Sequence, residues 1–164
     1  MDDMPQAIFF DLDDTIIDFT APADPAWVEV AERFAAHYGD TDAATVRRAI
    51  DRVSSRWWSD PGRHRAGRLA LRNTRVSNVA EALAGLDIAD DGLSTRMADT
   101  YAQLRTEALQ LFPGARTTLE HFRASGVPLA LLTPGHSPGQ RYQLARSDPA
   151  RSLRSNPPAD ECGP

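Results

Sequence analysis

Two short apolar runs, Ala7–Phe10 and Val127–Leu132, stand out because each gives way abruptly to polar residues. Neither run alternates apolar with polar positions, as an edge strand of a small antiparallel sheet would. Uninterrupted runs of this kind are typical of strands buried on both faces in a parallel sheet. We therefore expect two parallel strands. The first, Ala7–Thr15, delivers Asp11 and Asp13, and the second ends at Thr133-Pro134-Gly135.

The chain between these strands shows only helical periodicity, with apolar residues recurring every three or four positions. Asp24 is the expected cap of the first helix and Thr41 of the second. The expected helices end at Gly39, near Trp58, at Gly85 and near Leu109, the third beginning at Arg68 and the fourth at Gly92, and a short one ends at Gly126. This order predicts an α/β core from residues 1–18 and 111–147 and a helical insert from 19–110. Residues 148–164 are polar and proline-rich, which predicts a disordered tail.

The segment DLDDT carries the candidate chemistry. Asp11 and Asp13 are two residues apart, so an extended backbone places their side chains on one face, at the strand end where such sheets bind ligands. Carboxylates suit Mg²⁺. One carboxylate can attack phosphorus while another protonates the leaving alcohol. The alternative is a solvated acidic turn or a helix N-cap, but the preceding apolar run and Thr15 favour a site for a divalent metal and a phosphoryl group.

Several motifs resemble the haloacid dehalogenase (HAD)-like hydrolase superfamily. FFDLDDT resembles its first motif, and LALLTPG its second. The helical block resembles the cap that one large subgroup inserts after the first motif. LFPGARTTLEHFRASGVPLALLT matches the run that this subgroup shows before its second motif, so the resemblance spans roughly Ala7–Arg146.

This resemblance implies an α/β fold, a HAD-like Rossmannoid core with an inserted all-helical cap, and a Mg²⁺-dependent phosphatase of a small phosphorylated metabolite. It implies that Asp11 is the nucleophile and a metal ligand. Asp13 is implied to be the general acid/base, with its backbone carbonyl on the metal. Thr133 is implied to bind the phosphoryl group, and Thr15 to brace the loop. Members that resemble true dehalogenases lack the second acid, so Asp13 favours a phosphatase over a dehalogenase.

The sequence also departs from the family pattern. Pro134 replaces a residue whose N–H normally helps to hold the phosphate. The family's third motif usually supplies lysine, but all 18 basic residues here are arginine, and Arg141 and Arg146 are the nearest substitutes. For the acidic fourth motif, no acid after Thr133 follows an apolar run; those present are Asp148, Asp160 and Glu161.

The core is therefore expected to be truncated, with no further strand after the second motif. The first strand would then keep an unpaired edge, which favours self-association. These departures leave a second hypothesis open: a catalytically impaired member of the family that binds anions or a partner protein weakly.

Composition narrows the remaining classes. The net charge of −5 argues against nonspecific binding to nucleic acid. A single cysteine, Cys162, excludes a disulfide framework and predicts a cytoplasmic protein. No apolar run approaches the length of a membrane span. Nine arginines fall between Arg47 and Arg75; they either recognise an anionic group or form a solvated helical face. Trp57-Trp58 either line a cleft or pack the helical insert.

Overall fold

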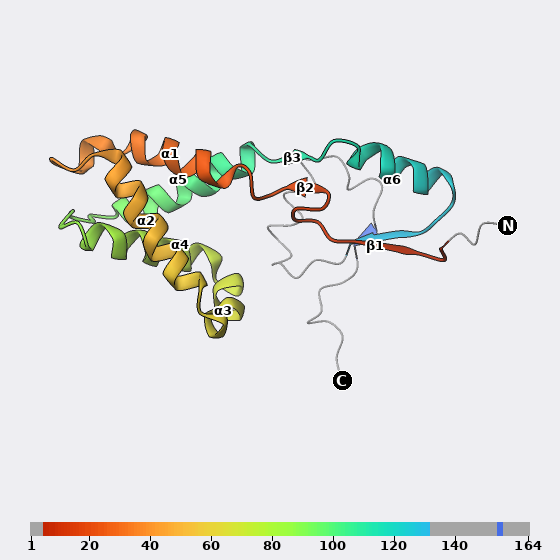
Figure 1. The fold of residues 1–164 in the computed structure, drawn as a ribbon, viewed down its shortest axis with the longest axis horizontal. Coiled ribbons are helices and arrows are strands. Elements are labelled where there is room, and N and C mark those ends of the chain that lie inside the picture. The colour runs from red at the N-terminus through yellow and green to blue at the C-terminus, as the bar shows by residue number, and fades with distance from the viewer. Residues whose placement is uncertain (1–4, 132–153, 156–164) are drawn as a thin grey trace. The chain divides into compact units, whose positions relative to one another are not determined.

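A computed structural model describes residues 5–131 and the backbone of residues 154–155. The chain divides into two compact units (Figure 1). The first, called the α/β unit below, combines Met1–Thr20 with Leu109–Pro164, and the second, the helical unit, is Ala21–Ala108.

The α/β unit is built on a small parallel sheet in the order β1-β4-β5. Strand β1 (Ile8–Phe10) pairs with β4 (Leu129–Leu131), with Phe10 opposite Leu131. The parallel pairing predicted from the two apolar runs is confirmed. Helix α6 (Ala115–Ala124) precedes β4. A second, antiparallel pair joins β2 (Ile17–Asp18) to β3 (Gln110–Leu111).

Strand β1 is shorter and more exposed than the sequence predicts. It ends at Phe10 rather than Thr15. Ile8 and Phe10 pack against the core that contains Leu119 of α6, but Phe9, on the opposite face, is 60% exposed. Successive side chains of a strand point to opposite faces, and in the described part of the chain only one face of β1 joins the apolar core. The expectation of a strand buried on both faces is therefore wrong for β1.

The segment expected to be a disordered tail contributes a strand. Arg154–Ser155 form β5, which pairs in parallel with Ala130 and Leu131 of β4. The expectation of no strand after the second motif is therefore wrong at these two residues. Backbone pairing needs no apolar side chain, so a polar, aperiodic sequence gives no signal for it.

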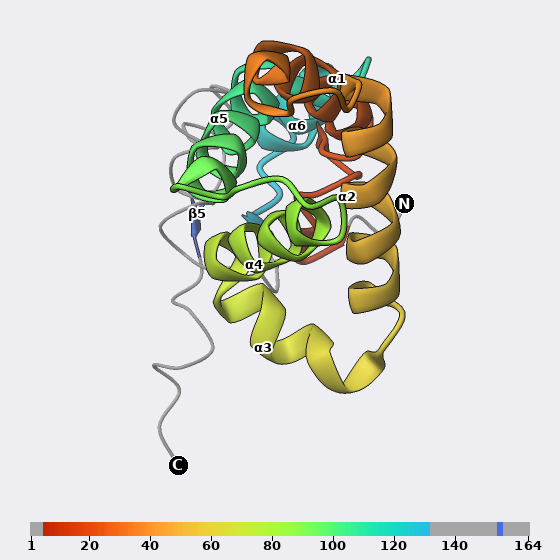
Figure 2. The same ribbon diagram turned by 90° about the vertical axis from the view of Figure 1, so that its left-hand side faces the viewer.

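The helical unit packs its helices around one apolar core (Figure 2). Its fully buried side chains include Val30, Val46, Ile50, Val79, Leu83 and Met97. Its helices are α1 (Ala23–Arg33), α2 (Ala43–Trp58), α3 (His64–Leu69), α4 (Leu71–Ala84) and α5 (Leu93–Glu107), with short 3-10 helices at Ala35–His37 and Pro61–Arg63.

Two of the predicted helix caps are wrong. Asp42, not Thr41, caps α2, because its carboxylate accepts the Thr45 N–H at 2.7 Å. Asp24 lies inside the first turn of α1, where its carboxylate pairs with Arg47 instead of capping the helix. The helix predicted over Arg68–Ala84 is divided at Ala70, whose backbone leaves the helical region at φ −120° and ψ 41°.

In the described residues, no helix is long and apolar enough to cross a membrane.

Candidate active site

Asp11 and Asp13 follow the carboxyl end of β1 directly. Leu12 between them is 0% exposed, whereas Asp11 is exposed and Asp13 is half-buried. This alternation is what an extended segment gives when its middle residue enters the core. Leu12 therefore anchors the segment, and the two carboxylates lie at the rim of the sheet, Asp11 with open access to solvent.

The register of the sheet brings two chain segments to this rim. Phe10 and Leu131 are paired, so the carboxyl ends of β1 and β4 reach the same edge, where parallel sheets bind ligands. Thr133 follows β4 by two positions and lies outside the described residues. Pro134 and the other residues weighed for the third and fourth motifs lie outside them as well: Arg141, Arg146, Asp148, Asp160 and Glu161. Their roles remain predictions.

The loop after β1 is held by backbone hydrogen bonds on both sides of Asp13. The Ile17 N–H donates to the Leu12 carbonyl at 3.0 Å, and the Asp14 N–H donates to the Ile17 carbonyl at 2.8 Å. The Ile16 carbonyl accepts the Phe112 N–H at 3.0 Å, beside the β2–β3 pair. The neighbours of Asp13 therefore fix the backbone that carries it.

Asp14, the third acid of DLDDT, has a structural role that sequence reasoning missed. Its backbone has φ 55°, a left-handed conformation that aspartate tolerates better than most residues. Its carboxylate accepts the N–H groups of Phe19 at 3.0 Å and Thr20 at 2.8 Å, and the Thr20 hydroxyl at 2.6 Å. Thr15, predicted to brace this loop, is exposed and makes no side-chain hydrogen bond within the described part of the chain. The bracing therefore comes from Asp14. The available signal was the tendency of aspartate to hydrogen-bond nearby backbone in turns.

The oxygen donors at this rim fit a hard cation. Mg²⁺ is usually held by one or two carboxylates, with waters and substrate phosphate oxygens completing its shell. Asp11 and Asp13 supply two carboxylates. Among the described residues, no group of three or more metal-binding side chains gathers at one place. Such a site would depend on water and phosphate for its remaining ligands.

The arginines of the helical unit are largely engaged with carboxylates. Arg72 donates twice to Asp99, at 2.8 and 2.7 Å, which holds the pKa of the Asp99 carboxyl below its usual value. Other ion pairs link helices or neighbouring turns: Arg47 with Asp24, Arg56 with Glu81 and Arg63 with Asp60. These contacts favour the interpretation of these arginines as a solvated, paired face.

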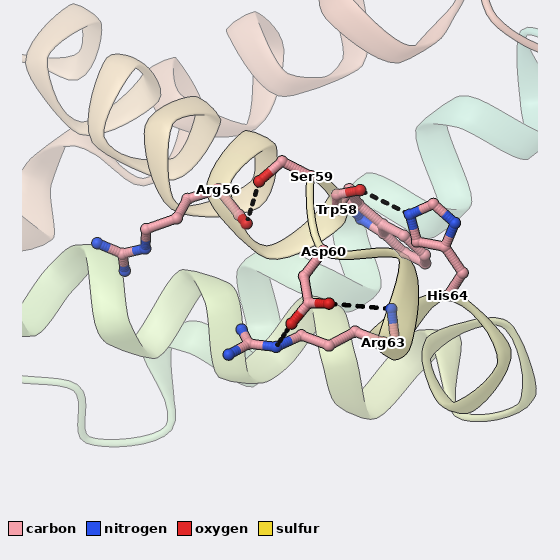
Figure 3. A network of polar contacts seen from close by, with 7 residues as sticks. Arg56, Trp58, Ser59, Asp60, Arg63 and His64 are labelled. Carbon is pink, nitrogen blue, oxygen red and sulfur yellow. Dashed lines mark hydrogen bonds and ion pairs between the residues drawn. The ribbon is translucent and has the colours of Figure 1, made fainter.

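The region after α2 is a compact polar turn (Figure 3). Asp60 accepts the Gly62 N–H at 2.9 Å and pairs with Arg63, while the His64 ring lies 2.7 Å from the Trp58 carbonyl oxygen. Trp57 and Trp58 contact each other edge to face, with ring centroids 4.6 Å apart. Gly67 of α3 lies against both indoles. The two tryptophans therefore pack this corner of the helical unit, as the packing alternative holds.

The comparison that decides the family is with sequence profiles: the profile of the haloacid dehalogenase-like hydrolases matches residues 5–152. The chain belongs to the haloacid dehalogenase-like hydrolases. The predicted fold class, a HAD-like α/β core with a helical insert, is confirmed by this match together with the solved structures described next. A search of curated proteins found no match.

Three solved structures illustrate the likeness of fold. A Bacillus subtilis protein designated HAD-hydrolase YfnB, in a crystal bound to magnesium, has a TM-score of 0.65 at 19% identity; the match covers 92% of this chain and 63% of YfnB. A Thermotoga maritima protein designated a β-phosphoglucomutase has a TM-score of 0.62 at 21% identity, covering 92% and 60%. The L-2-haloacid dehalogenase of Xanthobacter autotrophicus has a TM-score of 0.54 at 19% identity, covering 96% and 58%. This HAD-like chain thus spans about three fifths of the length of these proteins.

Proposed function

We propose that this HAD-like hydrolase cleaves phosphate monoesters of small metabolites through a phosphorylated aspartate. The observation that carries the proposal is the placement of exposed Asp11 directly after β1, with half-buried Asp13 two residues further on. In the proposed domain assignment, residues 1–18 and 111–147 are the hydrolase core, 19–110 the cap and 148–164 a tail.

The chemistry follows from what each carboxylate can reach. Asp11 attacks phosphorus, so that an oxygen–phosphorus bond forms as the bond to the leaving alcohol breaks. Asp13 gives its proton to that alcohol and then takes a proton from the water that releases phosphate from Asp11. Solvent access to Asp11 suits a nucleophile that must meet both substrate and water. Thr133 is proposed to donate a hydrogen bond to the phosphoryl group.

Magnesium is the proposed cofactor, held by Asp11 and Asp13. When bound, it would neutralise charge between the anionic carboxylate and the anionic substrate. The oxygen donor set at the rim supports this choice, as does the magnesium bound to the similar YfnB structure.

The test is hydrolysis of an aryl phosphate by the purified full chain, with Mg²⁺ and with EDTA. We expect metal-dependent turnover that Asp11→Asn abolishes, because an amide cannot replace the nucleophilic carboxylate. Asp40→Asn, which changes an exposed acid outside the α/β unit, is the matched control and should leave turnover unchanged. Undiminished turnover in Asp11→Asn would refute the role of Asp11.

A second candidate is a non-catalytic member of the family that binds anions or a partner protein. The sequence feature that favours it is the lack of lysine, the residue that usually forms the family's third motif. A folded wild-type chain with no turnover on any phosphate ester, but with measurable phosphate binding, would support this candidate over the first.

Self-association through β1 is proposed as well. In the described residues, β1 pairs only with β4, and Phe9 is 60% exposed beside the remaining edge. An exposed apolar edge strand can pair with another copy. Phe9→Thr retains a residue that suits strands and should shift light-scattering mass toward monomer. Val28→Thr, at an exposed position of α1, is the control. A wild-type chain that is monomeric at all concentrations would refute this proposal.

A further inference from the structure

Tyr101 of α5 is surrounded by aromatic and cationic groups inside the helical unit. Its ring is 4% exposed and stacks on Trp27, with centroids 4.1 Å apart and planes 16° from parallel. The guanidinium carbon of Arg75 lies 4.8 Å from the Tyr101 ring centroid, and that of Arg105 lies 5.9 Å away. Two guanidinium groups, from α4 and α5, therefore meet at one aromatic ring.

Arg75 differs from the paired arginines around it. It is half-buried, yet within residues 5–131 its guanidinium makes no hydrogen bond and no ion pair. The nearest acid, Asp99, uses both of its oxygens to accept from Arg72. Burial lowers the pKa of Arg75, and Arg105 lowers it further, although Tyr101 and Asp99 act in the opposite direction. Arg75 is thus a partly desolvated cation with unused donors.

A second polar group lies one helical turn further along α4. Asn78 is 3% exposed, and its side-chain amide makes no hydrogen bond within the described part of the chain. Buried polar groups are nearly always hydrogen-bonded, so such a residue needs an explanation. Residues three apart on a helix are neighbours on its surface, which places Asn78 beside Arg75.

We propose that Arg75 and Asn78 form a binding site for a small oxyanion, a carboxylate or a phosphate, within the helical unit. The guanidinium supplies two parallel N–H donors, which match two oxygens of such a group. The amide of Asn78 supplies a further donor. The Tyr101 ring holds the guanidinium in place through its cation–π contact. The site uses neither Asp11 nor Asp13, so it is independent of the proposed hydrolysis.

The competing explanation is that the cation–π contact and nearby Asp99 compensate Arg75 fully. That explanation gives no role to Asn78 and predicts no response to anions. The two explanations therefore differ in a measurable quantity, the change in thermal midpoint when an oxyanion replaces chloride.

The experiment uses the full chain carrying Asp11→Asn, in EDTA, so that the proposed catalytic site does not contribute. Thermal midpoints are measured across a series of sodium phosphate or sodium acetate concentrations, each matched in ionic strength with sodium chloride. We expect at least one of the two anions to raise the midpoint above that in chloride. A response to phosphate alone or to acetate alone supports the site and identifies its ligand.

Three variants locate the response. Arg75→Gln should weaken the apparent affinity by about tenfold or more, since a charge-assisted hydrogen-bonded pair is lost. Asn78→Leu keeps the branching of the side chain, should fold without loss of thermal midpoint in chloride, and should also weaken the anion response. Arg52→Gln removes the same charge from an exposed position of α2 and should leave the response intact. No response of the parent chain to either anion, or an equal response in Arg75→Gln and Arg52→Gln, would overturn the proposal.

Discussion

Replacement of Asp14 is expected to destabilise the α/β unit because this residue combines three accepted hydrogen bonds with a left-handed backbone. Each bond is worth roughly 0.5–1.5 kcal/mol net, and the site is exposed, so Asp14→Gly should cost about 1–3 kcal/mol. Asp14→Ala loses the same bonds and also meets the steric cost of φ 55°, so it should be about 1 kcal/mol less stable than the glycine variant. Asp14→Asn keeps one oxygen acceptor and should lie closest to wild type.

The free energy of unfolding is measured by urea denaturation, with slopes compared so that only midpoint changes are interpreted. Asp40→Ala is the control, because Asp40 is exposed and has no positive φ; such surface changes usually stay within about 0.5 kcal/mol. If Asp14→Gly and Asp14→Ala both unfold like wild type, Asp14 does not brace the loop. Equal losses in the two variants would retain the hydrogen bonds as the cause and remove backbone strain from the explanation.

Three further predictions concern the helical unit. Gly67→Ala should lower the free energy of unfolding by about 1–3 kcal/mol in urea, since a Cβ there would lie 2.2 Å from the Trp57 ring; the usual gain from alanine in a helix would refute this clash. Burial raises the pKa of Tyr38 to about 12, so the stability that Tyr38 contributes below its ordinary pKa of 10.0 should be lost as the pH rises through 12; unfolding of Tyr38→Phe over this range should lack that loss. Hydrogen bonds from Thr45 lower the pKa of Asp42, so Asp42→Ala should melt below wild type at neutral pH, and this difference should vanish as the pH falls through the lowered pKa; a difference that persists in acid would refute the charge-dependent cap.

The parallel pairing of the two apolar runs could be predicted because burial leaves a strong signal in the sequence. The exposure of Phe9 could not, because the run reads the same whether one or both faces are covered. Coverage depends on which segments pack above the strand, and the hydrophobic pattern of the strand itself carries no information on them. The same limit explains β5, whose pairing is made by backbone groups that every residue type carries.

The helix ends show a related limit. Asp24 and Asp42 have equally good capping chemistry, yet only Asp42 caps a helix, while Asp24 pairs with Arg47 of α2. Sequence reasoning weighs a residue against its local neighbours, whereas Arg47 is distant in sequence and becomes a neighbour only in the folded chain. Element existence was therefore predictable, and the partner of each charged side chain was not.

This limit bears most on the arginines. Nine arginines between Arg47 and Arg75 look alike in the sequence, as an anion-binding surface or as a solvated face. The structure separates them by their partners: Arg72 is held by both oxygens of Asp99, and that same contact leaves Arg75 without a carboxylate, over Tyr101. A satisfied guanidinium has little further affinity for an anion, whereas a desolvated one gains from any oxyanion that reaches it. The choice between the two interpretations is therefore made residue by residue, and it favours anion binding only where pairing fails.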